Sequence, residues 1–180
     1  MRDDAVRMVI GTATLIGRRG VLSSGSYLEI GAYCLLAPQV YVASAEHLYE
    51  PVPFRPLMNT GIRDYGSIIV EENCWLGINS VVSGPIRIGR GSVVGANAVV
   101  RQNVPPFSVV VGQPARIVRM FDPESGSWRA VRRPEDRTQV EEARRRSPLP
   151  SREAYAEFLG RIAGGRGIDP IVAGRGQHLE

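Results

Sequence analysis

The stretch VEENCWLGINSVVSGPIRIGRGSVVGANAVV, residues 70–100, decides the fold of this chain. Every sixth position in it holds an aliphatic residue: Val70, Leu76, Val82, Ile88, Val94 and Val100. The position four residues beyond each of these is mostly small: Cys74, Ser80, Ile86, Ser92, Ala98 and Val104. A period of six matches neither the 3.6-residue period of an α-helix nor the two-residue alternation of a single strand. It predicts a repeated unit made of one short strand and one corner.

The same period of six occurs twice nearer the N-terminus. One run is Ile10, Ile16 and Leu22, and a second run, displaced by two residues, is Ile30, Leu36 and Val42. Together with the six later hexads, these twelve hexads predict about four coils of three faces each, with the aliphatic residues pointing inward. The coils would stack at the β-sheet spacing of roughly 4.8 Å. An ordinary β-sandwich with Gly-rich turns is the alternative, but it does not require six-residue spacing.

Three segments carry a resemblance to a known family: IGTATLIGRRG (residues 10–20), LEIGAY (28–33) and the long run from ENCWLG to ARIVR (72–119). They resemble the hexapeptide-repeat acyltransferases, most closely the sugar and capsular-polysaccharide O-acetyltransferases and the galactoside and maltose acetyltransferases. The resemblance covers roughly residues 8–120. Its most specific stretch is 70–119, where the terminal pattern V-P-P-x-x-V-V-x-G-x-P-A-R is matched from Val104 to Arg116. It implies an all-β fold built on a left-handed parallel β-helix, a homotrimer with active sites between subunits, and acetyl-CoA as co-substrate.

We expect two regions along the chain. Residues 8–119 would form the hexapeptide-repeat β-helix domain, and residues 120–180 a partly helical C-terminal extension. Within the extension, a short helix is expected near 135–146 and a second near 151–163, with Ser151 as its N-cap. The second helix carries four apolar residues on one face: Tyr155, Phe158, Leu159 and Ile162. That face should pack on the coil or on a neighbouring subunit.

The repeat is interrupted after His47 for about twenty residues. We expect an ordered excursion loop over residues 48–67, because this segment combines three prolines with Tyr49 and Phe54, which suits neither coiling nor a flexible linker. Loops that leave a rigid scaffold are where functional groups are expected. His47 stands at the base of this loop, and the only other histidine of the chain is His178, near the C-terminus. His47 is therefore the candidate catalytic residue.

The chemistry that the resemblance implies suits a histidine at this place, because family members carry their catalytic histidine ahead of such a loop. Acetyl-CoA is already an activated thioester, so neither a metal nor a covalent intermediate is required. A general base that exchanges its proton near neutral pH makes an alcohol or amine nucleophilic and contributes roughly 10²- to 10⁴-fold. We expect His47 to be this base, with Glu50 or Glu46 orienting its imidazole. Either carboxylate could equally be a solvated loop charge.

The resemblance also implies contacts to coenzyme A. Trp75 and Gly77 match the tryptophan and glycine of the family's W-[IL]-G signature. Ala96 matches a position whose backbone contacts the pantetheine arm. The family often has serine or alanine after the signature glycine, whereas Ile78 stands here. An oxyanion donor at this place must therefore be a backbone N–H.

Three arginines are the candidate partners of the coenzyme's phosphates, because the planar guanidinium fork suits phosphate. Arg101, followed by Gln102, stands where the family has Thr-Lys, so the cation is kept but moved by one residue. Arg116 and Arg119 match the basic positions that follow the family's G-x-P. The alternative is that these arginines are solvated residues on a strand edge.

Charge and composition argue against nucleic acid and metal as partners. The chain carries 22 arginines, no lysine and a net charge of +4, and its arginines crowd into residues 129–146. Nucleic-acid binding is conceivable there, but the acidic residues mixed into the run favour a solvated, partly helical face. The γ-class carbonic anhydrases share this kind of coil but bind zinc through three histidines, a number that this chain does not supply.

The cysteines and the first residues favour a reduced, cytoplasmic protein. Cys34 and Cys74 lie inside apolar repeat segments, which is typical of small reduced core residues, although a disulfide is possible. The segment MRDDAVRMVI (1–10) has acidic residues where a signal peptide is basic. No stretch approaches the roughly 18 consecutive apolar residues that a membrane helix requires.

We therefore expect an acetyltransferase that moves an acetyl group from acetyl-CoA to a hydroxyl of a sugar or polysaccharide, with His47 as general base. Two other acceptors remain open: the nitrogen of an amino sugar, and a hydroxyl of an antibiotic or another natural product. A non-catalytic β-helix assembly subunit is the rival from another class of protein. The acceptor depends on the loop 48–67, because loop chemistry differs between relatives.

Overall fold

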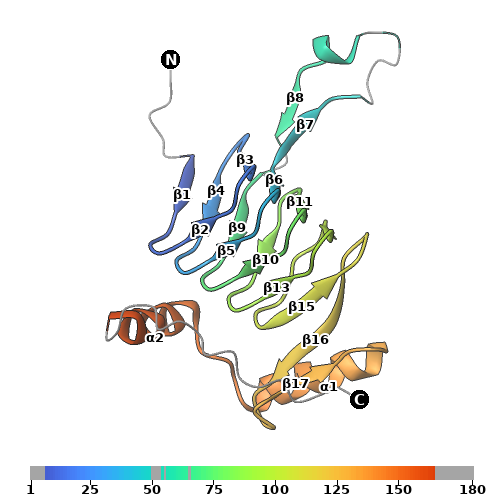
Figure 1. Ribbon diagram of the computed structural model, residues 1–180. Helices are drawn as coiled ribbons and strands as arrows, with labels where there is room; N and C mark the ends of the chain where they lie inside the picture. The colour runs from blue at the N-terminus through green and yellow to red at the C-terminus, as the bar shows by residue number, and fades with distance from the viewer. Residues whose placement is uncertain (1–6, 50–53, 55, 65, 165–180) are drawn as a thin grey trace.

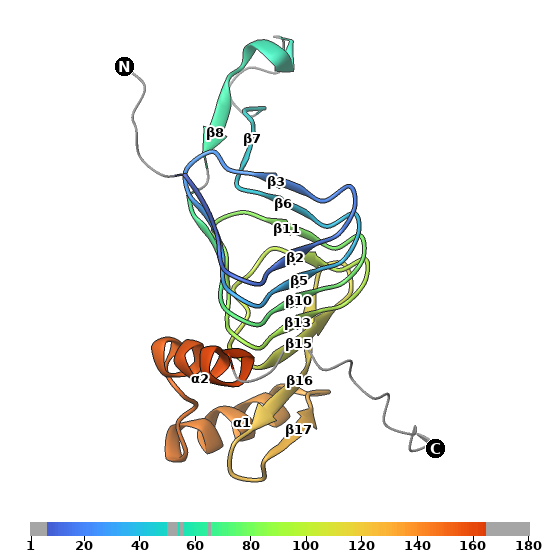
Figure 2. The same ribbon diagram turned by 60° about the vertical axis from the view of Figure 1, so that its left-hand side comes forward.

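The computed structural model describes residues 7–49, 54, 56–64 and 66–164 of the chain. Its main body is a coil whose three faces, here called A, B and C, are parallel sheets (Figures 1 and 2). Face A contains β1 (Met8–Ile10), β4 (Leu28–Ile30), β9 (Ile68–Val70) and β12 (Arg87–Ile88). Face B contains β2 (Leu15–Ile16), β5 (Leu35–Leu36), β10 (Trp75–Leu76), β13 (Val93–Val94) and β15 (Ser108–Val111). Face C contains β3 (Val21–Ser23), β6 (Tyr41–Ala43), β11 (Val81–Ser83) and β14 (Val99–Val100).

The strands of each face stack in the register that a period of six predicts. On face C, Val82 of β11 pairs with Val42 of β6 and with Val100 of β14. On face B, Leu76 of β10 pairs with Leu36 of β5 in the same parallel sense. One strand from each face makes one coil, and four coils follow one another: β1–β3, β4–β6, β9–β11 and β12–β14. The prediction of a stacked, strand-built coil is confirmed, and the β-sandwich alternative is wrong.

The aliphatic residues of the repeat form the hydrophobic core. All six members of the decisive stretch are at most 1% exposed: Val70, Leu76, Val82, Ile88, Val94 and Val100. The first coil differs, because Ile10 and Ile16 remain 46% and 42% exposed. Among the described residues, no further coil stacks on the first one to cover them. The expectation that every hexad buries its aliphatic residue is therefore wrong for these two.

Many corners of the coil place one residue in the left-handed backbone region, which disfavours most L-residues. The later coils use asparagine there, with φ of 55° at Asn73 and 57° at Asn79 and Asn97. The earlier coils use bulkier residues, such as Arg19 at 59° and Tyr33 at 60°. Since asparagine tolerates this region better, the later corners are the less strained ones.

After β15 the chain turns back as a β-hairpin that the sequence did not predict. β16 (Arg116–Asp122) runs antiparallel to β15, and β17 (Ser127–Ala130) runs antiparallel to β16, so face B continues beyond the coil. β16 crosses the boundary that was expected between residues 119 and 120. Two helices follow, α1 (Pro134–Arg146) and α2 (Arg152–Gly164), over nearly the same residues as the two predicted helices.

Helix α2 is tied to the corner between faces A and B. Arg152 donates to Glu72 at 2.6 Å and also forms an ion pair with Glu29 of β4. The Asn73 side-chain amide donates to the Tyr155 hydroxyl at 2.6 Å. The C-terminal extension is therefore fixed to the coil by charged and polar contacts at its second helix.

The apolar face expected on α2 is buried only in part. Leu159 is 7% exposed, and Tyr155 meets Phe107 edge-on with ring centroids 5.1 Å apart. Phe158 and Ile162 stay 47% and 56% exposed in the single chain, so for these two residues packing on a neighbouring subunit stays a prediction.

Helix α1 closes the C-terminal end of the coil, and it buries Val140 and Ala143. Arg144 of this helix donates to the carbonyl oxygens of Phe107 at 2.9 Å and Phe121 at 3.0 Å. Burial lowers the pKa of this guanidinium from its ordinary value. The interpretation of the arginine run as a solvated face is thus wrong at Arg144, which joins the helix to the coil and to β16.

The two cysteines are free and buried, as expected of reduced core residues. Cys34 Sγ donates to the Glu71 carbonyl at 3.1 Å, and Cys74 Sγ donates to the Gly89 carbonyl at 3.3 Å. Burial raises the pKa of Cys74 well above its ordinary value. Neither helix in the described ranges has the length and apolar character needed to cross a membrane.

Two neighbouring leucines of β5 test the core directly. Leu36 is 1% exposed and Leu35 is 44% exposed, on opposite sides of the same strand. Leu36→Ala should lower the free energy of unfolding by about 2–5 kcal/mol, because it leaves a cavity in an inner column. Leu35→Ala should cost less than about 1 kcal/mol. Urea unfolding followed by circular dichroism measures both, and equal losses for the two variants would contradict the assignment of inner and outer sides.

Candidate active site

The corner between faces C and A, here called the C–A corner, carries both His47 and Arg101. The excursion leaves the coil there, directly after Ala43 of β6. Ala43 pairs with Ser83 one coil further along, and Arg101 follows β14, which is the next strand of face C. Stacked strands lie about 4.8 Å apart, so Arg101 leaves this corner roughly 10 Å along the coil axis from Ala43. The base of the excursion and Arg101 therefore lie along one edge of the coil.

The excursion is a two-stranded ribbon rather than a plain loop. β7 (Ala45–His47) pairs antiparallel with β8 (Ile62–Asp64), and a 3₁₀ turn, η1, covers Leu57–Asn59 (Figure 1). The ribbon is anchored at its base, because the Ser44 hydroxyl accepts a hydrogen bond from the Gly25 amide at 3.0 Å. His47 thus sits on an ordered strand that projects from the coil.

His47 is exposed on this ribbon and lies opposite Ile62 in the strand register. Glu46 is its neighbour on β7, and successive side chains of a strand point to opposite faces. The backbone therefore turns Glu46 away from the imidazole that it was expected to orient. Glu50, the other expected partner, lies outside the described residues, as does His178.

The residues that match the coenzyme signature gather on face B and at the corner between faces B and C, the B–C corner. Trp75 lies on the outside of face B and is 50% exposed. Gly77 donates its N–H to the Val94 carbonyl at 2.7 Å, and a Cβ atom at Gly77 would lie 2.6 Å from the Ala96 nitrogen. Only glycine fits there, so Gly77 and Ala96 stack directly on each other. Ile78, which stands beside them, is 46% exposed.

Face C separates the two corners. The ribbon that carries His47 leaves from one edge of face C, whereas Gly77 and Ala96 lie at the other edge. The described chain therefore does not bring His47 next to Trp75, Gly77 or Ala96. A second copy of the chain would be needed to place these two groups of residues across one groove.

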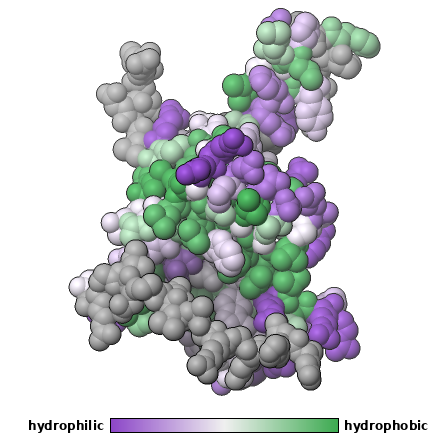
Figure 3. Space-filling view, viewed as in Figure 1, coloured by the Kyte–Doolittle hydropathy of each residue, from purple (hydrophilic) through white to green (hydrophobic). Residues whose placement is uncertain are grey.

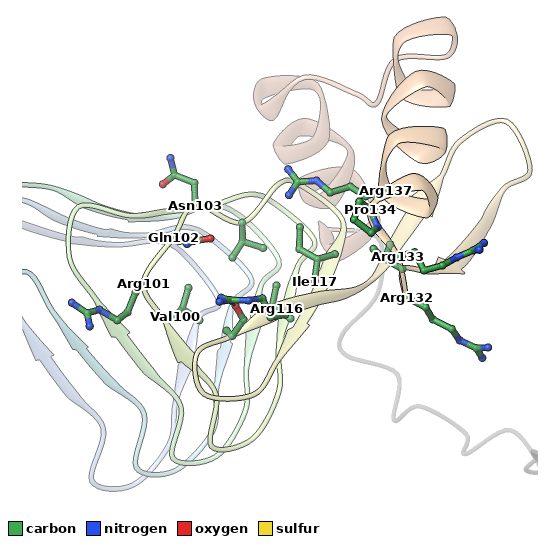
Figure 4. A pocket seen from close by; sticks show the side chains of 14 residues that line it. Val100, Arg101, Gln102, Asn103, Arg116, Ile117, Arg132, Arg133, Pro134 and Arg137 are labelled. Atoms are coloured by element: carbon green, nitrogen blue, oxygen red, sulfur yellow. Dashed lines mark hydrogen bonds between the residues drawn. The ribbon is translucent and has the colours of Figure 1, made fainter.

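A cavity of 360 Å³, here called the arginine pocket, opens at the C-terminal end of the coil (Figure 4). Its lining includes five arginines and no acidic residue: Arg101, Arg116, Arg132, Arg133 and Arg137. Its apolar lining comes from the end of the core: Val100, Val104, Val110, Ala115 and Ile117. The pocket unites two of the three arginines that were predicted to hold phosphates. The third, Arg119, is exposed on β16 opposite Val109 and does not line the pocket.

The arginines of the pocket differ in their own contacts. Arg133 pairs with Asp136 at 3.5 Å, and Arg137 pairs with Glu141 at 2.7 Å. Within the described chain, Arg101 and Arg116 form no ion pair, and Arg116 donates only to the neighbouring Ala115 carbonyl at 3.0 Å. Arg101 and Arg116 therefore carry positive charge that no carboxylate of the described residues neutralises, which is the property that a phosphate site requires.

A second cavity of 290 Å³ borders the arginine pocket and contains a buried carboxylate that the sequence reading missed. Glu71 accepts hydrogen bonds from Arg87 Nη1 at 2.7 Å and from the Arg90 amide at 2.9 Å. Burial raises the pKa of this carboxyl, but the Arg90 amide and the Arg87 guanidinium hold it below its ordinary value. The sequence signal for this carboxylate was the acidic pair Glu71 and Glu72 at one corner, with Arg87 and Arg90 one coil further along.

The described side chains offer no candidate metal site. Within residues 7–49, 54, 56–64 and 66–164, no three side chains of histidine, cysteine, aspartate or glutamate cluster as a metal site requires.

Known proteins with similar sequences match the repeat region of this chain. Residues 67–102 match the family described as bacterial transferase hexapeptide (six repeats). A Schizosaccharomyces pombe protein named as an acetyltransferase is 36% identical over 54% of this chain and 45% of its own length. The Escherichia coli protein WbbJ, named as a lipopolysaccharide biosynthesis O-acetyl transferase, is 30% identical over 59% of this chain and 57% of its own. The chain thus spans about half the length of these relatives.

Two solved structures resemble the chain in fold and sequence. A hexapeptide-repeat acetyltransferase of Vibrio cholerae, complexed with acetyl coenzyme A, is 34% identical with a TM-score of 0.56, over 63% of this chain and 60% of that one. A maltose O-acetyltransferase of Clostridium difficile is 27% identical with a TM-score of 0.55, over 64% of this chain and 63% of that one.

The buried carboxylate of Glu71 should make the stability of the protein depend on pH. Glu71→Gln should lower the free energy of unfolding at neutral pH by about 1–3 kcal/mol, because two guanidinium groups lose a buried charged partner. A carboxylate whose folded-state pKa is depressed stabilises fully above its ordinary pKa and loses this contribution as the pH falls through the folded-state pKa. Urea unfolding at decreasing pH should therefore show the two proteins converging.

The matched control is Glu141→Gln, which removes the surface pair between Glu141 and Arg137 on α1. Such a pair contributes only about 0.3–0.5 kcal/mol, so this variant should stay close to the wild type at every pH. A stability gap between wild type and Glu71→Gln that stays constant as the solution is acidified would contradict the assignment.

Proposed function

We propose that this chain, whose repeat coil belongs to the hexapeptide-repeat transferase family, moves an acetyl group from acetyl-CoA to a hydroxyl of a sugar or polysaccharide. The observation that carries the proposal is the likeness of the coil to the Vibrio cholerae acetyltransferase that was solved with acetyl coenzyme A. The arginine pocket supports it independently, because Arg101 and Arg116 line it, form no ion pair within the described chain, and suit the phosphates of a coenzyme. In line with the family resemblance, we take the coil to be left-handed.

His47 is proposed as the general base. Its imidazole accepts the proton of the acceptor hydroxyl while that oxygen attacks the carbonyl carbon of the thioester. As the carbon–sulfur bond breaks, the imidazolium returns the proton to the leaving sulfur, so His47 ends the cycle as it began. Because Ile78 carries no hydroxyl, we propose that a backbone N–H beside Gly77 donates to the carbonyl oxygen and stabilises its negative charge. Glu50 stays a candidate for orienting the imidazole.

The remaining coenzyme contacts are proposed along the coil axis. The pantetheine arm would pass Trp75 and the backbone of Gly77 and Ala96, and the phosphates would reach Arg101 and Arg116. Arg119 is a weaker candidate, because it lies outside the arginine pocket. The sugar acceptor is supported by the names of WbbJ and of the Clostridium difficile maltose O-acetyltransferase. An amino-sugar nitrogen and a natural-product hydroxyl remain the alternative acceptors.

A homotrimer is proposed as the working form, because one chain leaves His47 and the B–C corner on opposite edges of face C. A neighbouring copy would bring the C–A corner of one chain to the B–C corner of the next. The outer side of face B supports such contacts, because Leu15, Leu35 and Trp75 form an exposed apolar row that pairs in register. Apolar side chains gather over the coil in the view of Figure 3.

The trimer has a direct consequence for the mass of the protein in solution. Sedimentation equilibrium should give three times the 19.7 kDa mass of the chain, because one copy alone does not bring His47 to the B–C corner. A monomer that transfers acetyl groups at full rate would contradict the placement of the active site between subunits.

The catalytic assignment is tested by release of the coenzyme A thiol with a panel of mono- and polysaccharide acceptors. His47→Ala should slow release by roughly 10²- to 10⁴-fold, because the acceptor hydroxyl loses its base. His178→Ala removes the other histidine of the chain and should leave the rate unchanged. Equal rates for wild type and His47→Ala would overturn the role of His47. A wild type that releases no thiol with any acceptor and binds no coenzyme A would favour the non-catalytic assembly subunit.

A further inference from the structure

Two cavities meet at the junction between the coil and helix α1. The arginine pocket of 360 Å³ and the second cavity of 290 Å³ share Asn103, Val104 and Arg137 in their linings. The second cavity adds Arg87 and Glu71, and that carboxylate is already matched by arginine contacts. We call the joined cavities the arginine groove. One wall of the groove belongs to the coil and the other to the C-terminal extension.

Arg137 is the residue of the extension that faces both cavities. Its Nε donates to Glu141 Oε1 at 2.7 Å, one helical turn further along α1, which fixes the side chain and leaves its two terminal amino groups for other partners. In the view of Figure 4, the side chains of Arg116 and Arg137 both point toward the coil side of the pocket, Arg101 lies further out on the coil, and Arg132 and Arg133 point the opposite way. Arg137 therefore lines the same pocket as Arg101 and Arg116 although it comes from helix α1.

The positions of His47, Arg101 and α1 along the coil axis indicate which phosphate of coenzyme A would reach Arg137. The ribbon of His47 leaves the C–A corner at the second coil, Arg101 follows at the same corner in the fourth, and α1 lies beyond the last coil (Figure 1). Coenzyme A is a linear molecule with the thiol at one end, a diphosphate further along, and a 3′-phosphate on the adenosine at the far end. If the thioester lies at His47, the 3′-phosphate is the anion that reaches α1.

We propose that Arg137 binds the 3′-phosphate of coenzyme A, and that the C-terminal extension thereby makes the protein select coenzyme A over its 3′-dephospho form. Phosphate monoester and guanidinium match in charge and geometry, and a planar fork can donate two hydrogen bonds to one phosphate. The proposal rests on the proposed function, since it requires coenzyme A in the groove. The C-terminal extension would then recognise coenzyme A in addition to packing against the coil.

The test is isothermal titration calorimetry of the full chain with coenzyme A and with 3′-dephospho-coenzyme A. Wild type should bind coenzyme A about ten- to a hundredfold more tightly, as expected for one charge-assisted contact. Arg137→Gln should lose most of this preference by weakening coenzyme A while leaving the affinity for the dephospho form unchanged. Arg145→Gln, an exposed residue of the same helix that lines neither cavity, is the matched control and should bind as wild type does.

The possible outcomes separate the two proposals. Arg137→Gln with the full preference of wild type would overturn the role of Arg137. Wild type that binds both ligands equally would overturn recognition of the 3′-phosphate while leaving acetyl transfer intact. Wild type that binds neither ligand would overturn the proposed function itself. Melting of Arg137→Gln followed by circular dichroism should match that of Arg145→Gln, since only a surface ion pair is lost.

Discussion

Hydrogen bonding between the backbones of consecutive coils is the constraint on which the rest of this structure depends. Strands of two or three residues cannot stand alone, so each relies on the coil before and after it, as where Trp75 donates to the Ser92 carbonyl at 3.0 Å. The register cannot slip either. A shift of one residue would turn Leu76, which is fully buried, outward and bring Trp75 into the core. The period of six in the sequence is the trace of this requirement.

The same constraint orders the proposed site. Residues at one corner of successive coils fall into a row parallel to the axis, so the base of the His47 ribbon and Arg101 share an edge. The excursion does not disturb the stacking, because Ile30 still pairs with Val70 across it. The coil therefore carries the excursion at one corner, while Gly77 and Ala96, the proposed coenzyme residues, are held by close backbone contact at another.

The parts of the structure that follow from period and corner chemistry could be predicted from the sequence, whereas those that depend on long-range meetings could not. The burial of Leu76 and Val82 followed from spacing alone. The excursion was also predicted, but it leaves the coil after Ala43, so His47 lies on its first strand rather than at its base. The hairpin of β16 and β17 did not, because its second strand is exposed and carries no alternating pattern. The ion pair between the buried Glu71 and the half-exposed Arg87 joins residues 16 positions apart, and no pattern in the sequence marks it. That Arg137 and Arg116 line one pocket depends on the path of the chain through the hairpin.

The proposed function requires one spatial arrangement: the acyl end of the coenzyme lies at His47 and its phosphates lie in the arginine groove at the C-terminal end of the coil. A crystal structure of the full chain with bound coenzyme A tests this most directly. We expect the sulfur within roughly 3–4 Å of the His47 imidazole, or joined to it through one water, and the phosphates on Arg101, Arg116 and Arg137. A coenzyme whose sulfur lies away from every copy of His47, or whose phosphates lie outside the groove, would contradict it.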